Sequence, residues 1–178
     1  MVGIIQTILP YGVLISHILL VALFLAVIFR RTWGAGVVLY MGRYSLVIGL
    51  IIAISAVIGS LFYSEIVGFP PCVLCWWQRV FLYPQAALFA LAVWKKDSGV
   101  FLYSGTLAVL AGIVALYHSY VYWGGKSLLP CTALGGACDK IYVMEFGYIT
   151  IPTMSLTIVL YLLLLAWINR IYYLNTSK

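Results

Sequence analysis

Five long apolar segments constrain this 178-residue chain more than any other feature of its sequence. They lie at about residues 8–29, 45–63, 76–94, 100–123 and 153–168. A membrane-spanning helix needs about 20 mostly apolar residues, and each segment approaches or meets that length. Only 8% of the residues are charged, against about 25% in a typical soluble domain. The chain therefore lacks the charges to cover a water-exposed surface, and we predict an all-α, polytopic membrane helix bundle.

The positive charges indicate how the bundle is oriented. Cytoplasmic loops are enriched in Lys and Arg, and seven of the ten cations here fall between the first two segments, between the third and fourth, or after the fifth. These are Arg30, Arg31, Arg43, Lys95, Lys96, Arg170 and Lys178. We therefore expect the N-terminus outside and the C-terminus in the cytoplasm. Residues 1–7 lack the basic side chains that begin a signal peptide, so the first segment is expected to be a retained anchor. No basic run or face points to nucleic acid.

All four cysteines lie in two loops predicted on the outer side, where disulfides can persist. Cys72 and Cys75 are in the short loop before the third segment, and Cys131 and Cys138 are in the long loop before the fifth. Three interpretations compete for these four cysteines: a zinc site, structural crosslinks, or thiol–disulfide exchange. An oxidising compartment opposes zinc, and a Cys-x-x-Cys crosslink closes too short a loop to stabilise much. The spacing favours exchange, because it lowers a thiol pKa and keeps a second thiol close.

The residues around the Cys-x-x-Cys motif point to a site for negative charge. Pro70 and Pro71 prevent a helix until the motif begins, so Cys75 is expected near a helix N-terminus, where the dipole favours a thiolate. Arg79 follows one turn later on the same face and is expected beside Cys75. An arginine just inside a span is usually functional, although it can also extend to the lipid headgroups. Gln78 lies off this face and is assigned no role.

Two histidines lie within predicted spans. His118 is in the last third of the fourth segment, near the outer surface. It either hydrogen-bonds a neighbouring helix or faces the same cavity as Arg79, where it would donate to a carbonyl ligand, and the sequence does not separate these alternatives. His17, in the first segment, has no evident partner, so a structural role is preferred.

Three motifs resemble those of a known family. Phe69-Pro-Pro-Cys-Val-Leu-Cys-Trp-Trp-Gln-Arg-Val-Phe-Leu-Tyr-Pro84 is similar to the signature of the DsbB/BdbC disulfide bond formation proteins. In that signature an aromatic pair, a polar residue and an arginine follow the Cys-x-x-Cys. Ala115-Leu-Tyr-His118 and Phe146-Gly-Tyr-Ile-Thr-Ile-Pro152 are similar to later parts of the pattern, especially in the short-loop BdbC branch. The resemblance covers about residues 45–168, and its first motif is the most specific.

The resemblance implies a quinone reductase in the bacterial cytoplasmic membrane. Such proteins reoxidise a soluble, thioredoxin-like thiol oxidase of the DsbA type and pass its electrons to ubiquinone or menaquinone. Arg79 and His118 match residues near the quinone, and no metal is implied. Of the two cysteine pairs, the Cys-x-x-Cys matches the one that reduces the quinone, and the other matches the one that exchanges with the partner. The implied redox disulfides are Cys72–Cys75 and Cys131–Cys138.

The resemblance also implies a division of the chain. Residues 45–178 match a DsbB-like four-helix membrane domain, and residues 1–44 would be an additional N-terminal transmembrane helix with a cytoplasmic linker. The usual family core lacks that helix. Only six residues separate Cys131 from Cys138, far fewer than in long-loop relatives, so a smaller docking surface for the partner is expected.

The expected mechanism is a relay between the two pairs. The partner's dithiol reduces the Cys131–Cys138 disulfide, electrons move to the Cys72–Cys75 pair, and a Cys75 thiolate passes them to the quinone. Two alternatives remain. In vitamin K epoxide reductase homologues the loop cysteines precede the Cys-x-x-Cys, which is the reverse of the order here. A non-enzymatic membrane protein with structural disulfides would not turn over with a reduced DsbA-like protein.

Overall fold

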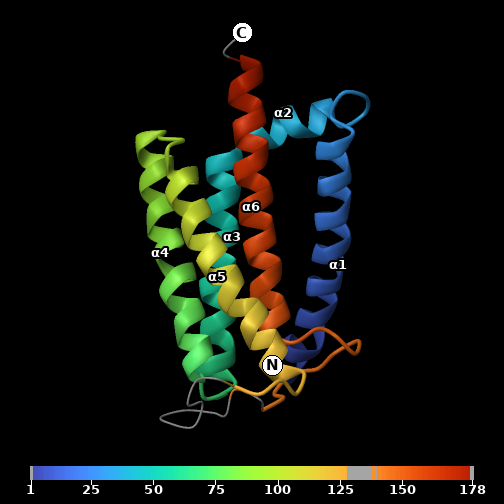
Figure 1. Cartoon of the computed structure of the whole chain (residues 1–178), viewed down its shortest axis with the longest axis vertical. Helices are drawn as coiled ribbons and strands as arrows, with labels where there is room; N and C mark the ends of the chain where they lie inside the picture. Colours follow the sequence, from blue (N-terminus) through green and yellow to red (C-terminus); the bar gives the residue numbers. More distant parts are fainter. Residues whose placement is uncertain (1, 128–137, 139, 177–178) are drawn as a thin grey trace.

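The computed structural model describes residues 2–127, 138 and 140–176, and all regular elements within them are helical apart from one isolated β-bridge, Glu145 to Ile149. The predicted all-α class is thereby confirmed, and Figure 1 shows the long helices side by side. The elements are α1 (Val2–Ile28), α2 (Ala35–Arg43), α3 (Ser45–Leu61), a π-helical turn η1 (Phe62–Ile66), α4 (Val73–Lys95), α5 (Val100–Tyr122) and α6 (Ile151–Thr176).

Four of these helices are long and apolar enough to cross a membrane. Among the described residues the candidate spans are Leu9–Ile28, Ser45–Ile66, Val100–Tyr122 and Ile151–Asn175. Helix α4 is as long as α5, at 23 residues, and runs alongside the others in Figure 1. It is less apolar because it carries Gln78, Arg79 and Gln85. That α4 also crosses the membrane stays a prediction, supported by its length and its place in the bundle.

The segment expected to be a linker between the first two spans contains a helix of its own, α2, which crosses one end of the bundle in Figure 1. It packs on α6 through Val38 and Gly42, which are buried. A Cβ added at Gly42 would lie 2.5 Å from Cβ of Tyr172, so only glycine lets the two helices approach this closely. Sequence hydropathy did not reveal this helix because it is short and only partly apolar.

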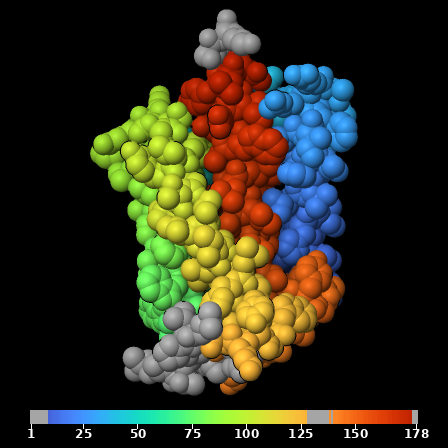
Figure 2. All heavy atoms as spheres, viewed as in Figure 1, coloured from blue at the N-terminus to red at the C-terminus, as the bar shows by residue number. Residues whose placement is uncertain are grey.

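The core of the bundle lies between α3, α4, α5 and α6. Phe89 of α4 is fully buried there, and Ala108 and Ala111 of α5 bring that helix close to its neighbours. Small residues allow such close approach between membrane helices, where van der Waals packing drives association. Helix α1 packs mainly on α6 and α2. Figure 2 shows it along one edge of the bundle, and many of its apolar side chains are exposed.

The two ends of the bundle differ in the way the sequence predicts. The start of α4, with Cys72 and Cys75, and the described part of the α5–α6 connection, with Cys138, lie at the same end as the N-terminus in Figure 1. The α1–α2 connection, with Arg30 and Arg31, and the end of α4, with Lys95 followed by Lys96, lie at the opposite end with the C-terminus. Cys72, Cys75 and Cys138 are therefore separated from these four cations by the length of the helices. Which end faces the cytoplasm stays a prediction.

Candidate redox site

The Cys-x-x-Cys motif forms the N-terminus of α4. Pro70 and Pro71 keep the preceding chain non-helical, and Cys72 is the N-cap of the helix. Its sulfur accepts a hydrogen bond from the backbone N–H of Cys75 at 3.3 Å. A thiol thus fills the capping role that Ser, Asp or Asn usually takes. The expectation that Cys75 lies near a helix N-terminus is met, since it is the third residue of α4.

Both members of the motif are free thiols, and their sulfur atoms lie 3.1 Å apart. Cys72 is 4% exposed, whereas Cys75 is half-buried. The hydrogen bond from the Cys75 thiol is the main cause that lowers the pKa of Cys72 well below its usual range. Hydrogen bonding by His118 and by the Cys75 backbone adds to this effect, which outweighs burial. In the dithiol state the negative charge is therefore favoured on Cys72, and not on Cys75 as the sequence suggested.

His118 joins the dithiol from α5. Its Nε2 lies 3.6 Å from the Cys72 sulfur, and its Nδ1 lies 3.1 Å from Nε2 of Gln78. An amide nitrogen can only donate, so Nδ1 must accept and the neutral ring carries its proton on Nε2, facing Cys72. Both alternatives for His118 therefore hold in part. The ring contacts a residue of a neighbouring helix, and it also lines the cavity described below. Gln78, which received no role from the sequence, orients this ring.

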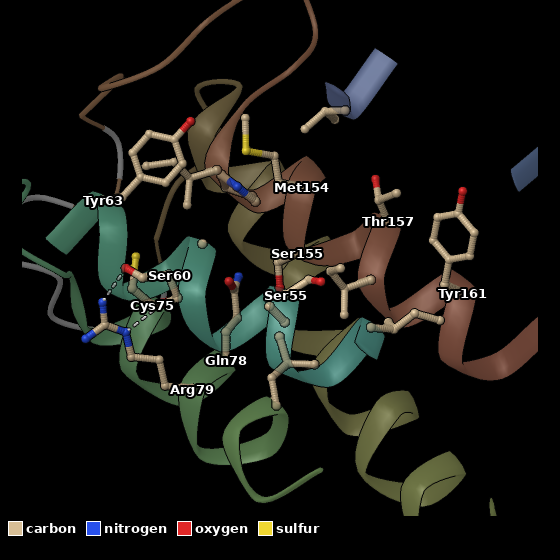
Figure 3. Close-up of a pocket in the computed structure, with 18 of the residues that line it drawn as sticks. Ser55, Ser60, Tyr63, Cys75, Gln78, Arg79, Met154, Ser155, Thr157 and Tyr161 are labelled. Carbon is tan, nitrogen blue, oxygen red and sulfur yellow. Dashed lines mark hydrogen bonds between the residues drawn. The ribbon is translucent and has the colours of Figure 1, made fainter. Parts of the chain in front are cut away.

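Arg79 lies near the dithiol but is held by α3. Its Nε donates to the Ser60 hydroxyl at 3.1 Å, and a terminal nitrogen lies 3.4 Å from the Ser60 carbonyl. The Tyr83 hydroxyl also donates to Ser60, and the guanidinium lies 5.1 Å from the ring centre of Trp76. Figure 3 shows Cys75, Ser60 and Arg79 together at one side of the cavity. No hydrogen bond joins Arg79 to Cys75 within the described residues, although both line the same cavity.

The second cysteine pair is only partly described. Cys138 is disulfide-bonded and 1% exposed, while Cys131 lies outside the described residues. Cys138 belongs to the same buried cluster as Cys72, together with Leu74 and Val121. The fold therefore brings a disulfide sulfur from the long loop into the same cluster as the free dithiol at the end of α4.

A cavity of about 440 Å³ opens beside the dithiol, within the usual range for small-molecule sites, roughly 300–1,000 Å³. Cys75, Gln78, Arg79 and His118 line it at one end. The Ser155 hydroxyl, contributed by α6, also lines it and is buried without a hydrogen-bond partner among the described residues. Since a buried polar atom without a partner is costly, this hydroxyl is available to a ligand. The sequence signal for Ser155, as for Ser60, is only a polar residue in an apolar segment.

The zinc alternative can be compared with this geometry. The sulfur atoms of Cys72 and Cys75 and a ring nitrogen of His118 lie within 4.8 Å of one another, which is close enough to ligate one metal ion. The described residues offer three such ligands, whereas structural zinc sites have four. Within the part of the chain that the structure describes no fourth ligand joins these three, and the Cys138 disulfide in the same cluster supplies the second reactant for thiol–disulfide exchange.

Comparison with known proteins agrees with these observations. Residues 42–169 match the family model described as "Disulfide bond formation protein DsbB". The chain is 33% identical to "Probable disulfide formation protein C 2" of Bacillus anthracis over 129 residues, 72% of this chain and 92% of that protein. It is 34% identical to "Disulfide bond formation protein C" of Bacillus subtilis (strain 168) over 108 residues, 60% of this chain and 78% of that protein. No solved structure matches. The chain belongs to the DsbB family and has a role in disulfide bond formation.

Proposed function

We propose that this protein reoxidises a DsbA-like, extracytoplasmic thiol oxidase and passes the electrons to a membrane quinone. One observation carries the proposal: a free dithiol lies in the same buried cluster as the disulfide-bonded Cys138, at the polar end of an apolar cavity. A dithiol and a disulfide in one cluster are the two reactants of an exchange reaction. A structural crosslink needs neither a free dithiol nor an adjoining cavity.

The first half of the reaction exchanges thiols for disulfides without net oxidation. A thiolate of the reduced partner attacks the Cys131–Cys138 disulfide, and its second thiol then releases the oxidised partner. The two thiols formed on the loop reduce the Cys72–Cys75 disulfide in the same way. Each step breaks one S–S bond and forms one, so the two electrons arrive on the Cys72–Cys75 pair. The dithiol in the structure corresponds to this electron-loaded state.

The second half oxidises that dithiol. With Cys72 as thiolate and Cys75 as thiol, forming the Cys72–Cys75 bond releases two electrons and the one proton that Cys75 carries. The second proton that a quinone would need comes from solvent, to which Cys72 had already lost its own. When bound, a quinone accepts two electrons and two protons as it becomes the hydroquinone. Cys72 holds the negative charge before oxidation, because it accepts hydrogen bonds from Cys75 and His118. Cys75 keeps its proton until the S–S bond forms, and it lines the cavity with Arg79.

The cavity fits a quinone at its polar end. Arg79 is a donor that lines it, and Ser155 offers a hydroxyl with no partner among the described residues. His118 also lines it, but its Nε2–H faces Cys72. Arg79 and Ser155 suit the carbonyl oxygens of a flat ring, which only accept hydrogen bonds. We propose that Arg79 and Ser155 orient the ring from α4 and α6 and that His118 lies at its edge near the sulfur atoms.

The redox potentials explain why such an acceptor is needed. DsbA-type disulfides have potentials near −120 mV, whereas glutathione-like couples lie near −200 mV. Reoxidation by the latter would be uphill by about 80 mV, or about 3.7 kcal/mol for two electrons. A respiratory quinone is more oxidising and is dissolved in lipid, which accounts for a helix bundle whose dithiol lies beside an apolar cavity.

We further propose that the protein lies in the bacterial cytoplasmic membrane with its cysteine end outside. The cations at the opposite end support this orientation by the positive-inside rule. Residues 45–178 would form the redox domain, and residues 1–44 would add a helix to it. The family match at residues 42–169 is consistent with that division.

The test is to mix the purified protein with a reduced DsbA-like protein and a quinone, and to count the remaining thiols over time. We expect many partner dithiols oxidised per protein molecule, and none beyond background with Cys72→Ser or Cys75→Ser. Without quinone, the wild type should oxidise only as many partner dithiols as its own disulfides can accept electrons from. Thiol loss that stops at the same level with and without quinone would support structural disulfides instead, and normal turnover by either serine variant would overturn the relay.

A further inference from the structure

Helix α1 lies outside the residues that match the DsbB family, yet it lines the same cavity as the dithiol. The match begins at residue 42, after α1 has ended. Leu9, Val13, Ser16 and Leu23 of α1 nevertheless line the cavity, facing residues of α3 and α6. Helix α1 therefore forms one wall of the cavity, in addition to being an extra helix outside the family match.

The cavity is much longer than a quinone ring requires. Its lining residues on α6 run from Ile151 to Ile168, and 17 steps of about 1.5 Å give about 26 Å. The hydrocarbon core of a bilayer is about 30 Å thick. Figure 3 shows Cys75 and Arg79 at one side of the cavity and Thr157 and Tyr161 at the opposite side. A ring occupies only the polar end, so the remaining length suits a chain.

The polar side chains along this length are turned away from a ligand. Ser16 donates to the Val13 carbonyl, and Ser55 donates to the Ile51 carbonyl, both at 2.7 Å. Thr157 donates to the Thr153 carbonyl at 2.8 Å. Hydroxyls that bond back to their own helix expose mainly their carbon atoms. The rest of the lining includes Ile48, Ile52, Leu164 and Leu165, so beyond the redox end the cavity is effectively hydrocarbon.

Polar contacts hold α1 in place as this wall. His17 Nε2 lies 2.7 Å from the Thr157 hydroxyl, and the Tyr148 hydroxyl lies 3.3 Å from His17 Nδ1. The Tyr161 hydroxyl donates to the Ser16 carbonyl. Interhelical hydrogen bonds of this kind help to hold membrane helices together. They fix α1 to α6 while the space between α1 and α3 stays open as part of the cavity.

We infer that α1 forms the lipid-side wall of a channel that binds the long apolar chain of the electron acceptor, whose carbonyl-bearing ring lies at the dithiol. This inference rests on the proposed function. By this inference the N-terminal helix selects acceptors by the length of their apolar chain. A longer chain reaches further along α1, from Val13 toward Leu23. Phospholipid acyl chains share the same apolar chemistry, so the experiment must separate the two sources.

The experiment measures binding of quinones with no chain, a short chain and a long chain to the purified protein, at equal mole fraction in one detergent. Val13→Trp fills the channel one turn beyond Leu9, and Leu23→Trp fills its far end. Ile18→Trp is the matched control, because Ile18 is on the same helix and 64% exposed. Dissociation constants come from the shift in thermal unfolding with added quinone, and bound lipid is extracted and identified by mass spectrometry.

We expect Val13→Trp to weaken binding of the long-chain quinone by roughly tenfold or more, since displacing about two methylene groups is enough. Binding of the chainless quinone should not change. Leu23→Trp should affect only the long chain, and Ile18→Trp neither. Equal affinities in all variants, or extraction of phospholipid in place of quinone, would overturn the inference even if quinone-dependent turnover persists. Absence of quinone binding and turnover in the wild type would instead overturn the proposed function.

Either tryptophan variant alone tests the inference if the other fails to fold. Cooperative unfolding in detergent, and formation of the Cys72–Cys75 disulfide with a soluble oxidant, identify a folded variant. If folded Leu23→Trp loses only its tighter binding of the long-chain quinone, the result supports α1 as a wall of the channel. If a folded variant still binds the long-chain quinone as tightly as the wild type does, the result contradicts that role.

Discussion

The Nε2 atom of Gln78 lies 3.1 Å from Nδ1 of His118, and both side chains are buried. This contact fixes the ring so that its other nitrogen faces the sulfur of Cys72 at 3.6 Å. The hydrogen bonds to that sulfur lower the pKa of Cys72. Gln78 is thus a positioning residue that acts on the dithiol through His118.

Replacing Gln78 should raise the pKa of Cys72. In Gln78→Leu the His118 ring is free to place its proton on Nδ1, and the hydrogen bond to the thiolate is lost. A hydrogen bond is worth about 1 kcal/mol, so the shift should be somewhat under one pH unit. Ultraviolet titration of the thiolate in the reduced protein measures it. In the wild type the thiolate should persist at pH values below the usual thiol range.

Gln85→Leu is the matched control for this measurement. Gln85 is also buried in α4, but it bonds Ser104 and does not contact His118. Its replacement should reduce stability without moving the thiolate titration. An identical titration curve for Gln78→Leu and the wild type would contradict the positioning role.

Arg79→Ala should weaken quinone binding while both disulfides still form. A hydrogen bond from a charged group is worth about 1.5–3 kcal/mol, so the apparent affinity should fall by roughly 10- to 100-fold. Ser60→Ala should cause a smaller loss, because it removes a partner that orients Arg79. Arg43→Ala, in α2 at the opposite end of the bundle, is the control. Equal apparent affinity for quinone in Arg79→Ala and the wild type would remove Arg79 from the site.

Cys138→Ser should separate the two halves of the relay. Without the loop disulfide, the protein should no longer oxidise a DsbA-like partner. The Cys72–Cys75 pair should still oxidise a small dithiol with quinone, since its own surroundings are unchanged apart from one buried neighbour. Thiol counting with each reductant measures both activities. Loss of both would indicate that Cys138 is needed for folding, which thermal unfolding would reveal, and retention of both would contradict the relay.

Gly49→Ala should destabilise the bundle. A Cβ at Gly49 would lie 2.4 Å from Cε1 of Phe89, a fully buried ring in the core. Overpacking of this kind costs typically about 1–3 kcal/mol, so the thermal unfolding midpoint should fall. Gly59→Ala, in the same helix, meets no atom within 4 Å and should be neutral or slightly stabilising. A Gly49→Ala midpoint equal to that of the wild type would show that Phe89 moves aside freely.

Sequence patterns predicted the parts of this protein that depend on local composition. Long apolar segments have to be helices in a bilayer, since every backbone polar group must be satisfied within its own segment. The order of spans then places both cysteine loops at one end, and Pro70 and Pro71 determine where α4 begins. The family motif around Cys72 and Cys75 is likewise a continuous stretch of sequence.

Only the tertiary structure decided which side chains meet. The Gln78–His118 contact joins residues 40 positions apart, and the Arg79–Ser60 contact joins residues 19 positions apart. A helix that is apolar on all sides has no periodicity to tell which face meets a neighbour. The rotation of each helix about its axis is set by packing against the others. That rotation turned Gln78 toward His118 and Arg79 toward Ser60, and it made α1 a wall of the cavity.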